Sequence, residues 1–125
     1  MTPLETVNTF MNHIESKEVD AATVMLASDI SYENMPIDPV IGRDAVRQVL
    51  EGFLAPAGEI EWKVLSEWEV GNTVINERVD RFQIGDGWLE LPVAGFFEVT
   101  DGLITLWRDY FDMGSYMSQF STLTS

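Results

Sequence analysis

Two different spacings of hydrophobic residues divide the chain. Up to about residue 58, apolar side chains recur every three or four positions, which is typical of amphipathic helices. From about residue 59 to residue 112 they alternate with polar side chains, which is typical of half-buried strands. Helices followed by a run of strands predict an α+β fold, in which the helices pack across the concave face of a curved, mostly antiparallel sheet.

Three helices and one strand are predicted in the first part. Thr2, Pro3 and Glu5 have the spacing of a capping box, so the first helix begins there. The elements expected in chain order are a helix over residues 2–14, a short helix over 20–26, a strand over 30–35 and a helix over 42–56.

The second part predicts a meander of four strands. They are expected over residues 59–70, 73–83, 88–99 and 103–112, with turns at Gly71-Asn72, Asp86-Gly87 and Asp101-Gly102. A short helix is expected over residues 114–120. No linker or repeat interrupts the pattern, so one domain is expected over residues 1–125.

The register of the first hairpin decides which side chains face the core. Large apolar residues occupy nearly every even position of residues 59–70, and acidic residues most odd ones. A two-residue turn at Gly71-Asn72 would place the odd positions Lys63 and Leu65 beside Arg78 and Asp80. A three-residue loop with a bulge would place the even positions Trp62 and Val64 there instead. The bulged form is favoured because it buries the apolar face, and the acidic positions would then be solvated.

Composition excludes several classes of function. The chain carries 21 acidic and 7 basic residues, a net charge of −14, which disfavours nucleic acid and anionic membranes as partners. There is no cysteine, and His13 is the single histidine, so thiol chemistry, a Ser-His-Asp triad and a multi-histidine metal centre are not expected. No metal or cofactor is predicted. Without a long apolar run or a secretory leader, a cytoplasmic location is expected.

Polar residues break the apolar pattern on three strands. Tyr32 and Asn34 share one face of their strand, Arg78 and Asp80 share one face of another, and Asp109 lies between two aromatic positions. If these side chains converge inside the sheet, one guanidinium bridges two carboxylates, and burial with like-charge repulsion returns one proton to the pair. One acid and one base then result, as single-step addition of water requires. The alternative is an exposed structural ion pair, worth about 0–1 kcal/mol.

Apolar residues around these positions are candidates for the wall of a substrate pocket between sheet and helices. The candidates are Met25, Met35, Leu50, Phe53, Trp62, Phe82, Leu91, Val93 and Phe111.

Four segments resemble those of a known family, the limonene-1,2-epoxide hydrolases. They are Tyr32-Glu33-Asn34-Met35-Pro36, Gly42-Arg43-Asp44-Ala45-Val46, Glu77-Arg78-Val79-Asp80-Arg81-Phe82 and Trp107-Arg108-Asp109-Tyr110-Phe111-Asp112. The resemblance covers nearly the whole chain. It implies a cystatin-like cone of the nuclear-transport-factor-2 or SnoaL-like type, enclosing an apolar pocket.

The resemblance also implies roles. Asp109 would be the general base that shares a water molecule with Tyr32 and Asn34; Asp80 would protonate the epoxide oxygen, and Arg78 would hold both carboxylates. The expected activity is cofactor-independent hydrolysis of a small apolar epoxide, such as a terpene or cycloalkene oxide, to a vicinal diol. A homodimer formed through the outer face of the sheet is expected.

Two other functions fit parts of the pattern. One is a proton-transfer enzyme of the same fold, like a ketosteroid isomerase or polyketide cyclase, in which an Asp moves a proton beside a carbonyl. The other is a non-catalytic module that binds a small molecule. The proton-transfer mechanism needs no arginine between two acids, so Arg78 favours the hydrolase over it. A binding module would keep its ligand when Asp80 and Asp109 are replaced by neutral residues.

Overall fold

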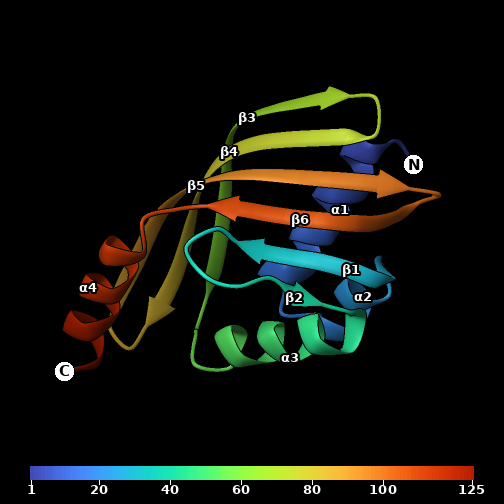
Figure 1. The fold of residues 1–125 in the computed structure, drawn as a ribbon. Helices are drawn as coiled ribbons and strands as arrows, with labels where there is room; N and C mark the ends of the chain where they lie inside the picture. Colours follow the sequence, from blue (N-terminus) through green and yellow to red (C-terminus); the bar gives the residue numbers. More distant parts are fainter.

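The computed structural model describes residues 1–125 and contains one six-stranded, strongly bent sheet (Figure 1). Its strands are β1 (Leu26–Asn34), β2 (Val40–Ile41), β3 (Ile60–Val70), β4 (Thr73–Ile84), β5 (Gly87–Thr100) and β6 (Leu103–Tyr110). Their order across the sheet is β2-β1-β6-β5-β4-β3, and β1 with β6 is the parallel pair. The predicted α+β class with a curved, mostly antiparallel sheet is confirmed.

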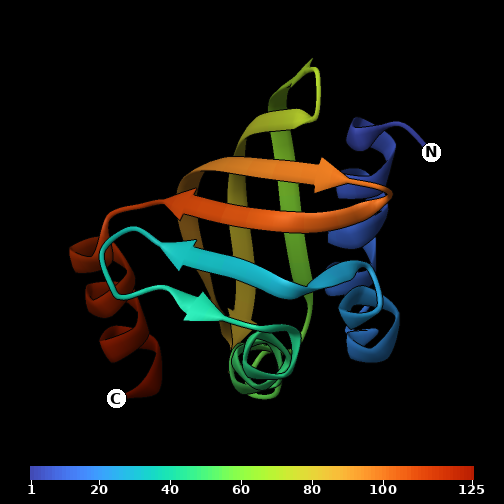
Figure 2. The ribbon, with the colours of Figure 1, turned by 45° about the vertical axis from the view of Figure 1, so that its right-hand side comes forward.

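Four helices surround the hollow of this sheet. They are α1 (Pro3–Glu15), α2 (Val19–Thr23), α3 (Arg43–Leu54) and α4 (Met113–Thr124). In Figure 2, α1 and α2 lie on one side of the bent sheet, α4 on the opposite side, and α3 is seen end-on below the strands. None of the helices combines the length and the apolar character needed to cross a membrane.

Helix α1 begins at the predicted capping box. The Thr2 hydroxyl accepts the Glu5 N–H at 3.1 Å, and the Glu5 carboxylate accepts the Thr2 N–H at 2.9 Å. Both ends of the helix are fixed to the edge strand β3. The Leu4 N–H donates to Glu69 at 3.1 Å, and Glu15 accepts the free backbone N–H of Trp62 at 3.1 Å. Helix α1 is thereby held over the concave face.

The register between β3 and β4 pairs the predicted residues, but the extra residue lies inside β3 and not in the loop. Trp62 pairs with Asp80 and Val64 with Arg78, as the bulged form requires, but the loop has only two residues, because Val70 pairs with Thr73. The extra residue is Leu65, inside β3, where the register shifts. The expectation of a three-residue loop is therefore wrong. Leu65 is also the apolar residue that interrupts the acidic positions of this strand.

The bulge exchanges the two faces of the last part of β3. Glu67 and Glu69 pair with the inward-facing Asn76 and Val74, so they lie on the concave side of the sheet, where both remain exposed to solvent as expected. Trp68 and Val70 point outward and are exposed. The expectation that these even positions are buried is wrong, because one additional residue inverts every side chain beyond it.

Other boundaries differ modestly from the predictions. The second helix ends at Thr23, and Leu26 begins β1 instead of ending that helix. The short strand β2 was not expected, since Pro36 and Pro39 precede it. Helix α4 is longer than predicted and is capped by Asp112, whose carboxylate accepts the Ser115 N–H at 3.2 Å.

Candidate active site

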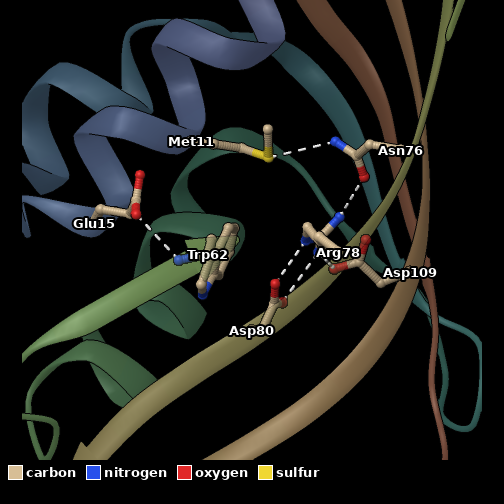
Figure 3. A network of polar contacts seen from close by, with 7 residues as sticks. All are labelled: Met11, Glu15, Trp62, Asn76, Arg78, Asp80 and Asp109. Atoms are coloured by element: carbon tan, nitrogen blue, oxygen red, sulfur yellow. Dashed lines mark hydrogen bonds and ion pairs between the residues drawn. The ribbon is translucent and has the colours of Figure 1, made fainter. Parts of the chain in front are cut away.

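The concave face of β4 and β6 carries a buried arginine between two carboxylates (Figure 3). Arg78 Nε donates to Asp80 Oδ1 at 2.7 Å and Nη2 to Asp80 Oδ2 at 3.2 Å. Nη2 also donates to Asp109 Oδ2 at 2.8 Å. The side chain of Arg78 is fully buried, and each aspartate side chain is 6% exposed. Arg78 thus joins its neighbour Asp80 to Asp109, which lies 31 positions after Arg78 in the sequence.

Neighbouring residues fix the guanidinium in place. Asn76, two positions before Arg78 on the same face, accepts from Nη1 at 2.8 Å. The ring of Trp62 lies with its centroid 5.0 Å from Arg78 Cζ, within range of a cation–π interaction. Gly95 on β5 pairs with both Asn76 and Asp109. A Cβ at Gly95 would lie 2.7 Å from Asn76 Oδ1 and 3.0 Å from Asp109 Oδ1, so the cluster needs a glycine there.

Strand β1 brings Tyr32 and Asn34 beside the cluster. In the parallel ladder Tyr32 pairs with Trp107 and Asn34 with Asp109. The Tyr32 ring is stacked on Trp107 with centroids 3.9 Å apart. Oδ1 of Asp109 is buried and accepts no hydrogen bond from the protein. An acceptor with this orphaned lone pair, next to a phenol and an amide, can hold a water molecule.

Burial changes the proton affinity of these groups. Burial raises the pKa of the Asp80 carboxyl to about 6, although the charge and hydrogen bonds of Arg78 oppose the rise. Burial also raises the pKa of Asp109 above its usual range, again against Arg78. Burial lowers the pKa of Arg78, but the charges of Asp109 and Asp80 outweigh that effect and raise it overall. The arginine therefore stays charged, and the carboxyl pair readily retains a proton.

Burial likewise raises the pKa of the Tyr32 hydroxyl far above its usual value, and the charge of Asp109 adds to the rise. Tyr32 is therefore a neutral hydrogen-bonding group, and it is not a base.

A cavity of about 210 Å³ opens beside the carboxylates. Asp80, Asp109, Tyr32 and Asn34 lie in its wall, and 11 of its 14 lining residues are hydrophobic. Six of the nine predicted pocket residues line this cavity: Phe53, Trp62, Phe82, Leu91, Val93 and Phe111.

Three predicted pocket residues do not line it. Leu50 is fully buried on the face of α3 that also carries Val46 and Leu54, whereas Val49 and Phe53 face the cavity. Met25 precedes β1 and is buried in the core, and Met35 lies in the turn after β1 with 44% of its surface exposed. Leu50 is excluded from the cavity by its position around the axis of α3. Met25 is excluded because β1 begins directly after it.

Sequence reasoning missed several residues of the site. Asn76 follows the same alternation as Arg78 and Asp80, so its place on the inner face could have been predicted. Gly95 is a glycine inside a strand, which indicates a close approach of other atoms to the backbone. Ile37, Val49, Met113 and Tyr116 also line the cavity. No group of three His, Asp or Glu side chains is arranged so that it could hold a metal ion.

The fold is shared with a broad class of small cone-shaped proteins. A putative SnoaL-like polyketide cyclase from Shewanella denitrificans superimposes with a TM-score of 0.85 over 96% of this chain and 97% of that one. The two sequences are 10% identical, so this similarity establishes the nuclear-transport-factor-2 and SnoaL-like fold and nothing further.

Sequence comparison defines the family. The model of the limonene-1,2-epoxide hydrolase catalytic domain matches residues 1–122. Epoxide hydrolase EphG from Mycobacterium tuberculosis is 35% identical over 107 residues, which are 86% of this chain and 71% of that protein. The solved structure of an M. tuberculosis LEH-like epoxide hydrolase is 32% identical, with a TM-score of 0.83 over 93% of this chain and 86% of that one. The chain therefore belongs to the limonene-1,2-epoxide hydrolase family, and its class of activity is epoxide hydrolysis.

Proposed function

We propose that the chain adds water to a small, mostly apolar epoxide in one step, without cofactor or covalent intermediate, and releases a vicinal diol. The observation that carries this proposal is the bridge formed by Arg78 between two buried carboxylates in the wall of an apolar cavity. Asp109 acts as the base, Asp80 as the acid, and Tyr32 with Asn34 orients the water.

The base is assigned from the free oxygen of Asp109. Its Oδ2 accepts from Arg78, whereas its buried Oδ1 has no protein donor and can accept a proton from water. As the water oxygen forms a bond to an epoxide carbon, the C–O bond of the ring breaks and Asp109 takes a proton from the water. Arg78 keeps the carboxylate oriented.

The acid is assigned to Asp80 because the free acceptor oxygen belongs to Asp109. Both oxygens of Asp80 accept from Arg78, and burial raises its pKa to about 6, so it holds a proton below about that pH. That proton passes to the epoxide oxygen as the ring opens, which avoids a free alkoxide. Each turnover leaves Asp109 protonated and Asp80 ionised, and exchange of one proton with solvent restores the pair.

The cavity supports a monocyclic substrate. An engineered apolar cavity of about 150 Å³ binds benzene, so 210 Å³ has room for about eight carbon-sized atoms by proportion. A small cycloalkene oxide such as cyclohexene oxide satisfies both the volume and the hydrophobic lining, whereas a terpene oxide of ten carbons would extend beyond this volume.

Diol formation from cyclohexene oxide and limonene oxide tests the proposal. Purified protein treated with a chelator is expected to form diol, and Asp109→Asn is expected to form at least a hundredfold less. Glu61→Gln, a matched loss of charge on the outer face, should keep full activity. Full activity of Asp109→Asn would exclude the assigned base.

A single turnover in ¹⁸O-labelled water tests the one-step route. The diol should contain ¹⁸O from the first turnover, because the attacking oxygen comes from water. Unlabelled diol in that turnover would mean that a carboxylate had attacked the epoxide, and would overturn the mechanism.

We also propose that two copies associate through the outer face of the sheet. Trp68 and Tyr110 are 52% and 43% exposed on that face, and the Tyr110 ring packs edge-on against Phe96 at 5.7 Å. Aromatic side chains of this kind are enriched in protein interfaces. Sedimentation should give a dimer, and Trp68→Lys a monomer, whereas Met117→Lys on α4 should leave the dimer intact. A monomeric wild type would refute this assembly.

A further inference from the structure

A second apolar cavity lies beside the first. Its volume is about 160 Å³, and no charged residue lines it. Gly52 and Phe53 of α3, Phe82 and Ile84 of β4, and Tyr116 and Phe120 of α4 form most of its wall. Nothing in the proposed reaction uses this space, because the two carboxylates and their water-binding partners all lie in the first cavity.

The two cavities share three aromatic walls. Phe53, Phe82 and Tyr116 line both of them. The Phe53 and Phe82 rings pack edge-to-face with centroids 6.0 Å apart. These three side chains stand between the two cavities, so a substrate that reached beyond the first cavity in this direction would have to move past them, and the Tyr116 hydroxyl is the one polar group among them.

One of these walls is carried by a weakly buried element. Helix α4 has no buried residue, and its Tyr116 ring is half-buried and stacked on Phe120 with centroids 5.9 Å apart. Gln119 fixes the helix to β5 by accepting the Glu90 N–H and donating to the Glu90 carbonyl, both at 2.9 Å. Low local burial is typical of elements that move to admit a ligand, so Tyr116 can turn aside at small cost.

We infer that the second cavity binds the distal part of the substrate, and that the natural substrate is an epoxide with an unbranched apolar chain rather than a bare ring. This inference rests on the proposed function, because the reacting end is placed at Asp80 and Asp109. By proportion with a benzene-sized cavity, the second cavity adds room for about six carbons beyond the roughly eight that fill the first. The chain turns past Tyr116 and lies between α3, β4 and α4.

A series of linear 1,2-epoxyalkanes measures the second cavity. Each buried methylene improves binding about threefold to fourfold. For the wild type, kcat/KM is expected to rise at least tenfold from 1,2-epoxyoctane to 1,2-epoxydodecane. No rise beyond the eight-carbon compound would overturn the inference.

Two variants that fill the second cavity test whether the rise in kcat/KM with chain length arises there. A Cβ built at Gly52 meets no atom within 4 Å, so Gly52→Phe can place a ring in the mouth of the cavity without disturbing α3. Ile84→Phe fills it from the sheet. Each should lose at least tenfold in kcat/KM on 1,2-epoxydodecane and change less than twofold on cyclohexene oxide. Gln48→Phe, which adds the same ring at an exposed position of α3 that lines neither cavity, should match the wild type. An unchanged chain-length dependence in both blocked variants would overturn the inference.

Binding of linear alcohols separates this inference from the hydrolase mechanism, since no reaction is needed. In calorimetric titrations 1-decanol should bind the wild type about tenfold more tightly than 1-octanol. The two alcohols should bind Gly52→Phe equally. Absence of diol together with this binding pattern would refute the mechanism and retain the cavity assignment. Equal binding of both alcohols to the wild type would refute the cavity assignment whatever the activity.

Discussion

Strand β4 carries two arginines, three residues apart, that each meet two carboxylates on opposite faces of the sheet. On the outer face, Arg81 lies 3.0 Å from Glu61 and 3.8 Å from Glu90, with its guanidinium 4.3 Å above the centre of the Trp88 ring. Its side chain is 26% exposed, and the two glutamates are about half exposed. In contact with water, such pairs are screened and each contributes about 0–1 kcal/mol.

The inner cluster has the same composition and a different chemistry. Arg78, Asp80 and Asp109 are removed from water, so desolvation competes with attraction and the carboxyl pair holds a proton that it would lose at the surface. The difference between the two clusters is therefore one of burial beside a cavity, which changes the proton affinity of the carboxyl groups while the kinds of charge stay the same.

The largest expected difference between the clusters is in rate. Asp80→Asn and Asp109→Asn should each reduce kcat/KM by about 10²- to 10⁴-fold while the fold survives, because each removes one proton-transfer partner. Glu61→Gln and Glu90→Gln should change it less than twofold. Steady-state kinetics on cyclohexene oxide measures kcat/KM of all four variants. A rate near that of wild type in either aspartate variant would show that the inner cluster is not needed for the reaction.

Replacing each arginine by alanine shows how much each cluster contributes to the free energy of unfolding. Arg78→Ala leaves two buried carboxyl groups without their donor and should lower the free energy of unfolding by about 3–5 kcal/mol. Arg81→Ala should lower it by about 0–1 kcal/mol. Denaturant titration monitored by tryptophan fluorescence gives both values. Equal effects would show that the inner cluster is as solvated as the outer one.

A methyl group at Gly95 tests how closely the inner cluster is packed. Gly95→Ala should destabilise the protein by about 1–3 kcal/mol and reduce kcat, since its Cβ would collide first with the guanidinium of Arg78 and then with Asn76 and Asp109. Ala94 is the neighbouring position on the exposed face of β5, so Ala94→Ser provides the control. Thermal melts and kinetics of both variants check this, and a fully active, stable Gly95→Ala would contradict the geometry.

The pH dependence of the rate should reflect the inner cluster and not the outer one. Asp80 must be protonated to act as acid, and its raised pKa of about 6 keeps it protonated below that pH. The value of kcat/KM should therefore fall as pH rises through about 6, approaching tenfold per pH unit. The Glu61→Gln variant should show the same profile. A rate that stays constant from pH 6 to pH 9 would exclude Asp80 as the acid.

Much of the fold and the five proposed catalytic residues could be predicted from local patterns. The capping box at Thr2 and the two-residue turn at Asp101-Gly102 depend on neighbours in the chain, and both are present in the structure. Alternation placed Arg78 with Asp80 on one face, and matching alternation on β1 and β6 placed Tyr32, Asn34 and Asp109 on corresponding faces.

Pocket membership was predicted less well, because it depends on packing between distant elements. Leu50 and Val49 are neighbours on the same amphipathic helix, and only the orientation of α3 against the sheet decides that Val49 lines the cavity while Leu50 enters the core. Tyr116 belongs to the site because α4 folds back across β4 and β5, a contact that no local pattern encodes.

By itself the sequence determined the period of each element, the acidic and cysteine-free composition, and the pairs of polar side chains that share a face, because these properties follow from local backbone geometry. The tertiary structure alone decided which faces point inward. The extra residue Leu65 turns Glu67 and Glu69 toward α1 and leaves Trp68 on the outer face. The pairing of the strands brings Arg78 between its two carboxylate partners. Side-chain alternation has a period of two, so a register change of one residue is enough to exchange interior and surface.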